Sequence, residues 1–374
     1  MNVIFVCSGT AGHINPALAI AEKLREKQAK ILFVGAGREM ENRLVPQAGY
    51  EIVNIKMSGL LRKPSLKMIT HNIKTVKNLL SAKKMVLKIF KEFEPDIVIG
   101  TGGYVCYPVI KAAHKNKIPT LIHESNVSPG LSVKLLSAVA DKVMTSFPGR
   151  EFCYKRPERV VYTGTPVLSR KSAIGENKPE KNEDADKAVM PLIVSFWGSL
   201  GAENMNKMMP EFIRLLIKDG GLRLIHAAGN SQDAELIKKE VGRHTDIDNY
   251  CRLVEIREYI DNMPELLSDA DVIMCRSGGA TIGEIIANTI PAVLIPSPYV
   301  SNNEQMENAK QLEKIGGAVV LEEKNCTGAF LFEQVTKIIN DEKKRKEMSE
   351  ALFSISRPDA AEYIADYIMS LAGK

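Results

Sequence analysis

A histidine beside two glycines offers the clearest place for proton chemistry. The segment from Ser8 to His13 has the sequence Ser-Gly-Thr-Ala-Gly-His and follows an apolar run typical of a buried strand. Glycines let the backbone approach a ligand closely, and the free amides at the start of a following helix favour negative charge. A neutral imidazole at such a turn has the chemistry of a general base. The alternative is a turn with a purely structural role.

The glycine spacing argues against two common nucleotide sites. Ile14 occupies the third glycine position of a GxGxxG dinucleotide turn, and the lysine of a P-loop is absent. Two other segments of the first half follow predicted strands, namely Gly100–Tyr104 (Gly-Thr-Gly-Gly-Tyr) and His123–Asn126 (His-Glu-Ser-Asn). Ligands of α/β sheets bind where strands end, so both segments are candidates to face a second ligand. A tight connection and a capping role for Asn126 are the alternatives.

The second half has a glycine turn of the same kind. Arg276–Glu284 follows an apolar run that ends at Cys275. A diphosphate there would be stabilised by free amides and by the helix dipole, with Glu284 one turn inside, within reach of ribose hydroxyls. The segment Asn303–Asn308 adds amides and acids suited to sugar hydroxyls. A helix cap and a polar helix start are the structural alternatives.

These segments need an α/β framework to position them. Short apolar runs alternate with helical patterns, which predicts parallel sheets covered on both faces. Strands are expected over 3–7, 31–34, 96–100, 120–123, 142–145, 192–196, 223–227, 271–274 and 292–295. Helices are expected from about Pro16 to Lys27, near 107–115, and from the turn at 198–201 to about Lys218.

A polar stretch over 168–188 interrupts this pattern, which then restarts. We therefore expect two Rossmann-like domains facing a central cleft, over 1–167 and 189–357. A final helix over 358–374 is expected to pack back on the first domain. The polar stretch is expected to be a solvated connector.

Composition limits the classes of function. The six cysteines are scattered without a CxxC pair, which predicts reduced thiols and no zinc framework. The closely spaced aspartates near 184, 246 and 269 do not follow strands as a metal–diphosphate site requires, so we expect neither a metal nor a cofactor. We expect no secretory signal, and no apolar run reaches the ~18 residues that span a bilayer. Any membrane contact is then peripheral.

The stretch from Lys56 to Lys91 carries ten basic residues and no acidic one, although the whole chain has a net charge of +5. Apolar residues recur at helical spacing between these lysines. A basic amphipathic surface suits an anionic membrane. The alternatives are a helix whose apolar face packs on the core, and a nucleic-acid surface, for which interleaved aromatic residues are lacking.

Taken together, the motifs resemble those of the bacterial family 28 glycosyltransferases, which have the GT-B fold. The resemblance covers essentially the whole chain. It is carried by Gly9–Leu18, Ser58–Leu60, Gly100–Tyr104, His123–Asn126, Gly164–Pro166, Gly198–Ala202 and Arg276–Glu284.

The resemblance implies a hexosyltransferase of peptidoglycan synthesis that inverts the anomeric centre and needs no metal. The implied donor is UDP-N-acetylglucosamine (UDP-GlcNAc). The implied acceptor is lipid I, the undecaprenyl-diphosphoryl-muramoyl-pentapeptide, at the cytoplasmic face of the membrane. His13 is the implied base, and partner proteins of cell-wall synthesis stay open. Implied donor contacts are Thr10, Ala11, Gly12, Asn126, Ser199, Ile260, Met263, Gly279, Ala280, Thr281, Glu284, Gln305 and Asn308.

Two further groups of residues follow from this interpretation. The acceptor is expected at Gly102, Gly103, Tyr104 and Glu124. An anionic membrane surface is expected at Ile69, Ile73, Lys74, Val76, Lys77, Leu79, Lys83 and Lys84.

The sequence also departs from the family pattern at five positions. Ala11 and Trp197 each replace a glycine, Ser125 a glutamine and Thr165 an asparagine, while Leu168 stands where many relatives have arginine. A different nucleotide sugar or acceptor, and a non-catalytic sugar-nucleotide-binding protein, are therefore the competing hypotheses.

Overall fold

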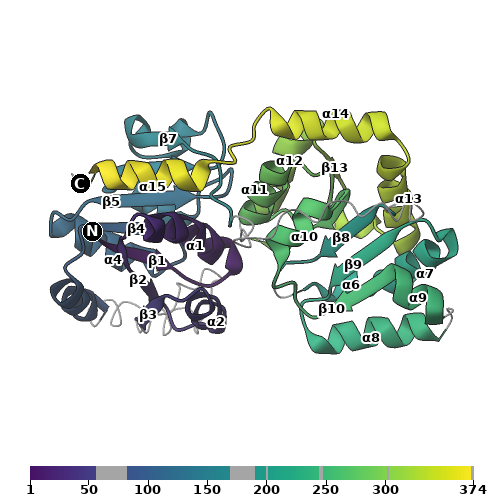
Figure 1. Ribbon diagram of the computed structural model, residues 1–374. Coiled ribbons are helices and arrows are strands. Elements are labelled where there is room, and N and C mark those ends of the chain that lie inside the picture. The colour runs from purple at the N-terminus through teal and green to yellow at the C-terminus, as the bar shows by residue number, and fades with distance from the viewer. Residues whose placement is uncertain (56–81, 169–189, 199–200, 244–246, 301–302, 372–374) are drawn as a thin grey trace, which may run out of the picture. The chain divides into compact units, whose positions relative to one another are not determined.

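The computed structural model describes residues 1–55, 82–168, 190–198, 201–243, 247–300 and 303–371. It divides into two compact units. Unit 1 comprises Met1–Leu168 and Arg357–Lys374, and unit 2 comprises Ser169–Ser356. The described residues of each unit form one parallel sheet with helices around it (Figure 1). The predicted α/β class is confirmed.

The described residues of unit 1 form a seven-stranded sheet in the order β3-β2-β1-β4-β5-β6-β7. Their bounds are β1 (Asn2–Cys7), β2 (Lys30–Gly35), β3 (Glu51–Asn54), β4 (Ile97–Gly102), β5 (Thr120–Glu124), β6 (Lys142–Thr145) and β7 (Val160–Tyr162). Every adjacent pair is parallel.

Strand β1 shows why these residues form a central strand. Val3 and Phe5 pack into the apolar cluster on one face, while Ile4 and Val6 pack into the cluster on the other. Successive side chains of a strand point to opposite faces, so a strand covered on both sides must be apolar throughout. Full burial of one such side chain stabilises the folded state by about 1.5–3 kcal/mol.

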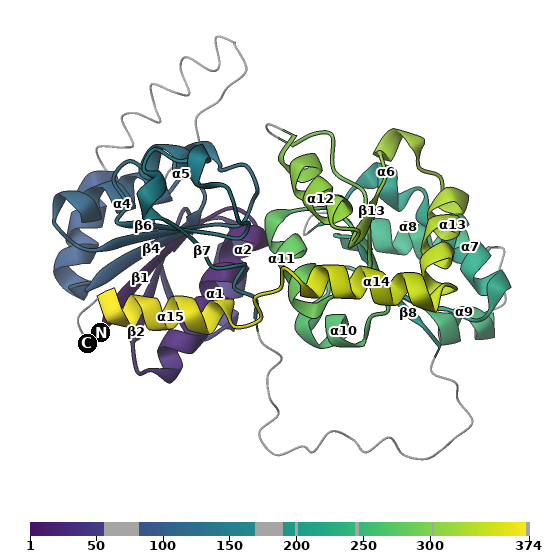
Figure 2. The same cartoon turned by 90° about the horizontal axis from the view of Figure 1, so that it is seen from above.

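The helices of unit 1 are α1 (Ala11–Glu26), α2 (Glu39–Gln47), a helix over 82–93, α4 (Cys106–Lys115), α5 (Leu131–Leu136) and α15 (Ala360–Leu371). Helix α15 lies along α1 in both views (Figures 1 and 2), with Ile364 and Ile368 in the same core cluster as α1. Lys27 forms ion pairs with Glu362 at 2.6 Å and Asp366 at 2.9 Å. The end of the chain therefore belongs to the unit that contains its beginning.

The predicted start of the first helix near Pro16 is wrong. Helix α1 begins at Ala11 after the N-cap Thr10, so Gly12 and His13 lie in its first turn. Proline is common at the first helical position, but Pro16 stands one turn further in. Its missing N–H leaves the Gly12 carbonyl without an i→i+4 donor. The burial of Ile14, Leu18 and neighbouring residues offsets that loss.

In the described part of unit 2 the sheet has six strands, in the order β10-β9-β8-β11-β12-β13. Their bounds are β8 (Leu192–Phe196), β9 (Arg223–Ala227), β10 (Val254–Arg257), β11 (Val272–Cys275), β12 (Ala292–Leu294) and β13 (Ala318–Val320). The helices are α6 (Glu203–Asn206), α7 (Met209–Asp219), α8 (Ser231–Gly242), α9 (Ile247–Leu253), α10 (Met263–Asp269), α11 (Gly279–Asn288), α12 (Glu304–Lys314), α13 (Gly328–Ile339) and α14 (Glu342–Phe353).

The single helix expected up to about Lys218 is two helices, α6 and α7. Pro210 in the first turn of α7 explains the break, because proline is favoured at a helix start and disrupts a helix interior.

Each sheet has one point where the strand order reverses. In unit 1 it lies between β1 and β4, and in unit 2 between β8 and β11. The connections on the two sides of such a point leave toward opposite faces, so ligands of α/β proteins bind there, at the carboxyl ends of the strands. Both reversal points coincide with glycine turns singled out from the sequence.

The packing of α15 on α1 is testable by substitution. Ile364→Ala should destabilise unit 1 by about 2–5 kcal/mol, because Ile364 is fully buried. Tyr363→Ala on the same helix is the control, since Tyr363 is 45% exposed and should change stability little. Urea unfolding followed by circular dichroism measures the loss. Fluorescence of Trp197, the only tryptophan, reports unit 2 and should keep its midpoint. Equal stability of the two variants would contradict this packing.

Candidate functional site

His13 is held at the turn after β1 by a defined hydrogen bond. Its Nδ1 lies 2.8 Å from the carbonyl oxygen of Ser8. A carbonyl only accepts hydrogen bonds, so Nδ1 carries the hydrogen and the neutral ring presents Nε2 as the acceptor. The ring is half-buried. This is the arrangement that a general base requires.

The second glycine turn lies directly against this histidine. A Cβ added at Gly102 would be 2.8 Å from Nε2 of His13, and one at Gly103 would be 2.7 Å from the Ser8 carbonyl oxygen. Both glycines have positive φ, +131° and +87°. Thr101 Oγ1 also donates to the His13 carbonyl at 2.7 Å. The structure therefore brings the turns after β1 and β4 together, and only glycine fits the contact.

Glu124 ends β5 on the same edge of the sheet, and its electrostatic environment includes His13. Burial raises the pKa of Glu124, while hydrogen bonds from Asn126 and Gly130 oppose that rise. Asn126 donates to it through both its backbone N–H and its side-chain amide at 3.0 Å, and Gly130 N–H donates at 2.9 Å. Glu124 thus shapes the loop that carries Asn126.

His123 precedes Glu124 in β5, so its side chain points to the opposite face of the sheet. It is fully buried, and its Nε2 donates to the Gly164 carbonyl at 3.1 Å. Burial lowers the pKa of His123 to about 4. The segment His123–Asn126 thus divides. Glu124 and Asn126 lie at the loop, whereas the imidazole of His123 lies in the interior.

Sequence reasoning missed Glu41 of α2. Its carboxylate is completely buried and accepts hydrogen bonds from the backbone N–H groups of Gly9, Ala36 and Arg38. The local signal was an acid three residues after the helix N-cap, as in a capping box. Tyr104, an expected acceptor contact, is half-buried, and its hydroxyl accepts from Nε of Arg38 at 3.2 Å.

In unit 2, α11 begins at Gly279 directly after the turn that follows β11. Its N-cap is Gly278, which has no side chain to cap the first amides, and its first turn holds no acid. Gly279 and Ala280 are buried, and Thr281 and Glu284 are half-buried along the helix. The positive end of this helix dipole is suited to an anion.

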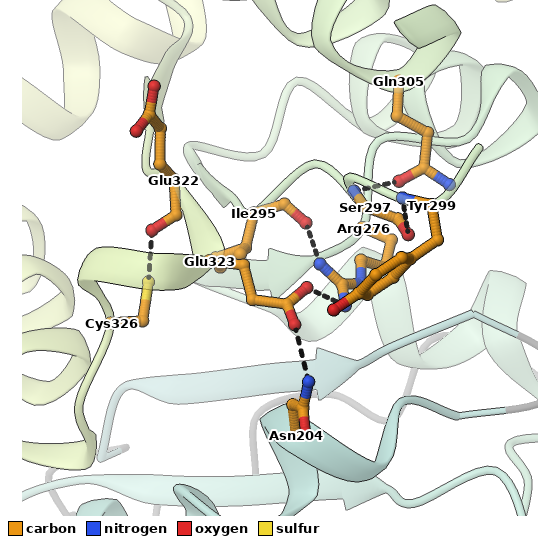
Figure 3. A network of polar contacts seen from close by, with 9 residues as sticks. All are labelled: Asn204, Arg276, Ile295, Ser297, Tyr299, Gln305, Glu322, Glu323 and Cys326. Atoms are coloured by element: carbon orange, nitrogen blue, oxygen red, sulfur yellow. Dashed lines mark hydrogen bonds and ion pairs between the residues drawn. The ribbon is translucent and has the colours of Figure 1, made fainter. Parts of the chain in front are cut away.

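The start of α12 is tied to the turn after β11. Asn308 is fully buried and donates to the Ser277 carbonyl at 3.0 Å, while Ser277 Oγ donates to the Gln305 carbonyl at 2.8 Å. The side-chain oxygen of Gln305 accepts from Ser297 N–H at 2.8 Å (Figure 3). Both amides expected at the donor sugar therefore also organise this turn.

A buried ion pair lies beneath the same turn. Arg276 Nη2 is 2.6 Å from Glu323 Oε2, and Arg276 Nη1 donates to the Ile295 carbonyl at 2.9 Å. Asn204 reaches the other oxygen of Glu323 at 3.3 Å (Figure 3). Removing one partner of a buried pair costs about 3–5 kcal/mol. These contacts, which the sequence did not predict, join the ends of β11 and β12 to the segment at Glu323.

The remaining predicted donor residues are distributed as follows. Ile260 is buried, and Met263 is half-buried at the start of α10, which packs against α11. Thr10 is exposed, and Ala11 and Gly12 are half-buried. Ser199 lies outside the described residues. Trp197 is 2% exposed and packs near His226, with ring centroids 6.0 Å apart, so the unit 2 core accommodates this departure from the family pattern.

Of the expected membrane residues, Lys83 and Lys84 are described, and both are exposed on the helix over 82–93. Ile69, Ile73, Lys74, Val76, Lys77 and Leu79 lie outside the described residues. Within the part of the chain that the structure describes, no helix is long and apolar enough to cross a membrane. The same residues contain no cluster of three His, Cys, Asp or Glu side chains that would hold a metal ion.

The structure thus has two α/β units, each with a parallel sheet and with glycine turns where the strand order reverses. These are the two parts of a GT-B glycosyltransferase. The family 28 glycosyltransferase N-terminal domain matches residues 3–145, and the family 28 C-terminal domain matches residues 192–364. The chain belongs to glycosyltransferase family 28.

Relatives that match over their full length show which enzymes of this family the chain is similar to. The chain is 40% identical to the UDP-N-acetylglucosamine–N-acetylmuramyl-(pentapeptide) pyrophosphoryl-undecaprenol N-acetylglucosamine transferase of Acetivibrio thermocellus, over 99% of this chain and 98% of that protein. It is also 40% identical to the enzyme of the same name from Thermoanaerobacter sp. strain X514, over 99% and 100%. Among solved structures, it is similar to MurG of Acinetobacter baumannii, with a TM-score of 0.70 and 26% identity over 99% and 100% of the two chains.

The buried His123 makes the stability of unit 1 depend on pH. Its pKa is about 4 in the folded protein and 6.5 when unperturbed, so the unfolded chain takes up the proton first. Stability should therefore fall as the pH drops from about 6.5 to about 4, by up to about 1.4 kcal/mol per pH unit. His123→Gln retains a donor for Gly164 but does not titrate, so its stability should fall less. Urea midpoints at about pH 7 and about pH 4.5 compare the two proteins. The same pH dependence in both would show that His123 does not cause it.

Proposed function

We infer that this protein transfers N-acetylglucosamine from UDP-GlcNAc to lipid I, and so makes lipid II for peptidoglycan synthesis. The observation that carries this inference is the full-length similarity, at 40% identity, to enzymes named for this transfer. The held imidazole of His13 and the uncapped start of α11 supply groups that the reaction needs.

The donor binds mainly to unit 2 in this proposal. The first amides of α11, at Gly279, Ala280 and Thr281, bind its diphosphate, and Glu284 accepts hydrogen bonds from the ribose. Ile260 and Met263 flank the uracil. Ser199, Gln305 and Asn308, together with Asn126 and Thr10–Gly12 of unit 1, are the residues proposed at the sugar.

The acceptor binds to unit 1. Its diphosphate lies at the turn of Gly102, Gly103 and Tyr104, close to Glu124. Burial raises the pKa of the Glu124 carboxyl group, so its charged form is less favoured there than in water.

The chemistry is a single displacement. Nε2 of His13 removes the proton from the acceptor hydroxyl as the hydroxyl oxygen attacks the anomeric carbon. The bond from that carbon to the UDP oxygen breaks, and the anomeric configuration inverts. The dipole of α11 stabilises the negative charge that develops on the departing UDP.

Transfer of labelled N-acetylglucosamine to lipid I by the purified protein tests this function. His13→Ala should lower turnover roughly 10²–10⁴-fold, the usual contribution of a general base, and leave UDP affinity unchanged. His114→Ala, a change to an exposed histidine of α4, is the matched control and should retain full activity. Near-normal turnover of His13→Ala would remove His13 from the mechanism.

Substrate panels separate the competing functions. Transfer from another nucleotide sugar but not from UDP-GlcNAc would indicate a different donor. Donor binding without turnover on authentic lipid I would indicate a non-catalytic protein.

A second part of the proposal is peripheral binding to the anionic cytoplasmic face of the membrane, through the basic stretch from Lys56 to Lys91. The absence of acidic residues there supports it, since each lysine near such a surface contributes about 1 kcal/mol. The exposure of Lys83 and Lys84 is consistent with that role.

Reversing Lys74, Lys77 and Lys84 to Glu should abolish binding to vesicles rich in anionic lipid and slow transfer to lipid I in bilayers. Transfer to a short-chain, water-soluble acceptor should persist, because the changes avoid the residues proposed at the site. High salt should weaken wild-type vesicle binding in the same direction. Equal loss on both acceptors would argue for a structural role of these lysines and against membrane docking.

A further inference from the structure

The peptide group between Ser8 and Gly9 is hydrogen-bonded at both ends. Its N–H, on Gly9, donates to Oε2 of Glu41 at 3.1 Å. Its carbonyl oxygen, on Ser8, accepts from Nδ1 of His13 at 2.8 Å. Because a peptide group is planar and conjugated, these two bonds act on one rigid unit. A buried carboxylate is thereby connected to the histidine through a single peptide group.

The site of Glu41 is built around its carboxylate. The side chain is fully buried, and its Oε1 accepts from the N–H groups of Ala36 and Arg38, the latter at 3.0 Å. A Cβ added at Gly35 would lie 2.7 Å from that oxygen, so the end of β2 leaves room for the carboxylate through a glycine. Three amide donors suit an ionised carboxylate, which can only accept.

We propose that Glu41 positions and strengthens His13 as a base through the Ser8–Gly9 peptide group. Hydrogen bonds in a chain polarise one another, so a negative charge at the N–H increases the electron density on the carbonyl oxygen. That oxygen then binds Nδ1–H more strongly, which holds the tautomer and the orientation of the ring and makes Nε2 more basic. The carboxylates that orient metal-bound histidines act in the same way, without the intervening peptide.

This proposal rests on the proposed function, in which His13 is the base. Other ionisable groups lie around the same chain of bonds. Glu124 acts electrostatically with His13, and Arg38 and the thiol of Cys7 lie near Glu41. The thiol of Cys106 lies near Cys7 and Glu124. The oxygens of Glu124 accept from Asn126 and Gly130 instead. The geometry therefore assigns the positioning role to Glu41.

Glu41→Gln tests the proposal with little change in shape. The glutamine oxygen can keep the two amides of Ala36 and Arg38, which leaves its NH2 group facing the N–H of Gly9 and breaks only that bond. We expect kcat to fall about 10- to 100-fold, the effect of removing an outer hydrogen-bond partner of a metal-bound histidine. KM for UDP-GlcNAc should not change. The acidic limb of the kcat/KM profile should move to lower pH, because the protonated imidazole loses a nearby negative charge.

Asp96→Asn is the matched control. Asp96 accepts from the N–H of Asn2 at 2.7 Å, at the opposite end of the same strand β1. This variant removes a carboxylate that holds β1 without touching the turn, so its pH profile should match that of the wild type. If Glu41 is merely structural, Glu41→Gln should behave like Asp96→Asn. Both variants would then contain fewer folded molecules, and the acidic limb of the kcat/KM profile would not move in either. That result would overturn the proposal.

A double-mutant cycle and nitrogen NMR complete the test. With His13→Ala in place, Glu41→Gln should cause no further loss of kcat, because it acts through His13. In ¹⁵N-histidine spectra of the wild type, neutral His13 should carry its hydrogen on Nδ1, and a hydrogen on Nε2 would overturn the proposal. These spectra need no substrate, and His13→Ala identifies the His13 signals among those of the six histidines. Absence of transfer by the wild type would refute the proposed function while leaving the hydrogen-bond chain to be judged by NMR.

Discussion

The burial of both faces of each parallel sheet is the constraint on which the rest of this structure depends. Val3 and Phe5 point into one core and Ile4 and Val6 into the other, so the middle of the strand has no place for reacting groups. Polar side chains concentrate where the strands end. The reversal of strand order then separates two connecting segments, which leave toward opposite faces of the sheet. His13 and the start of α11 occupy these two places for this reason.

Positions at strand ends need support, because a turn alone does not hold a side chain in one orientation. In unit 1 the support is the carboxylate of Glu41, together with the close contact between His13 and Gly102. In unit 2 it is the Arg276–Glu323 pair and the bond from Asn308 to Ser277. These groups are buried, and buried polar groups are costly unless paired. Their pairing therefore makes the turns rigid as well as stable.

Two departures from the family pattern have a structural explanation. Ala11 is the first residue of α1, where alanine favours the helix more than glycine does. Trp197 turns its ring into the core of unit 2, so its bulk is kept away from the start of the following turn. Both substitutions are thus accommodated by the elements in which they lie. A third departure, Leu168 in place of arginine, is half-buried and packs against the core cluster of unit 1 that includes α1 and α15.

The sequence by itself determined the central strands and the glycine turns. A strand buried on both faces must be a continuous apolar run, and β8 was predicted with its observed bounds, Leu192–Phe196. Positive φ is a local requirement, so glycine marks the turns at Gly102 and Gly103. The outer strands β3, β7, β10 and β13 escaped prediction, because short strands, several of them only partly buried, lack such a run.

Tertiary structure alone decided which polar residues meet. His13 and His123 are the same residue type beside similar strands, yet one lies at the turn and the other is fully buried. Glu41 reaches Gly9 across 32 residues of sequence, and Arg276 reaches Glu323 across 47. Such contacts depend on which strands become neighbours and on what the packed core excludes from water. No local pattern in the sequence records either.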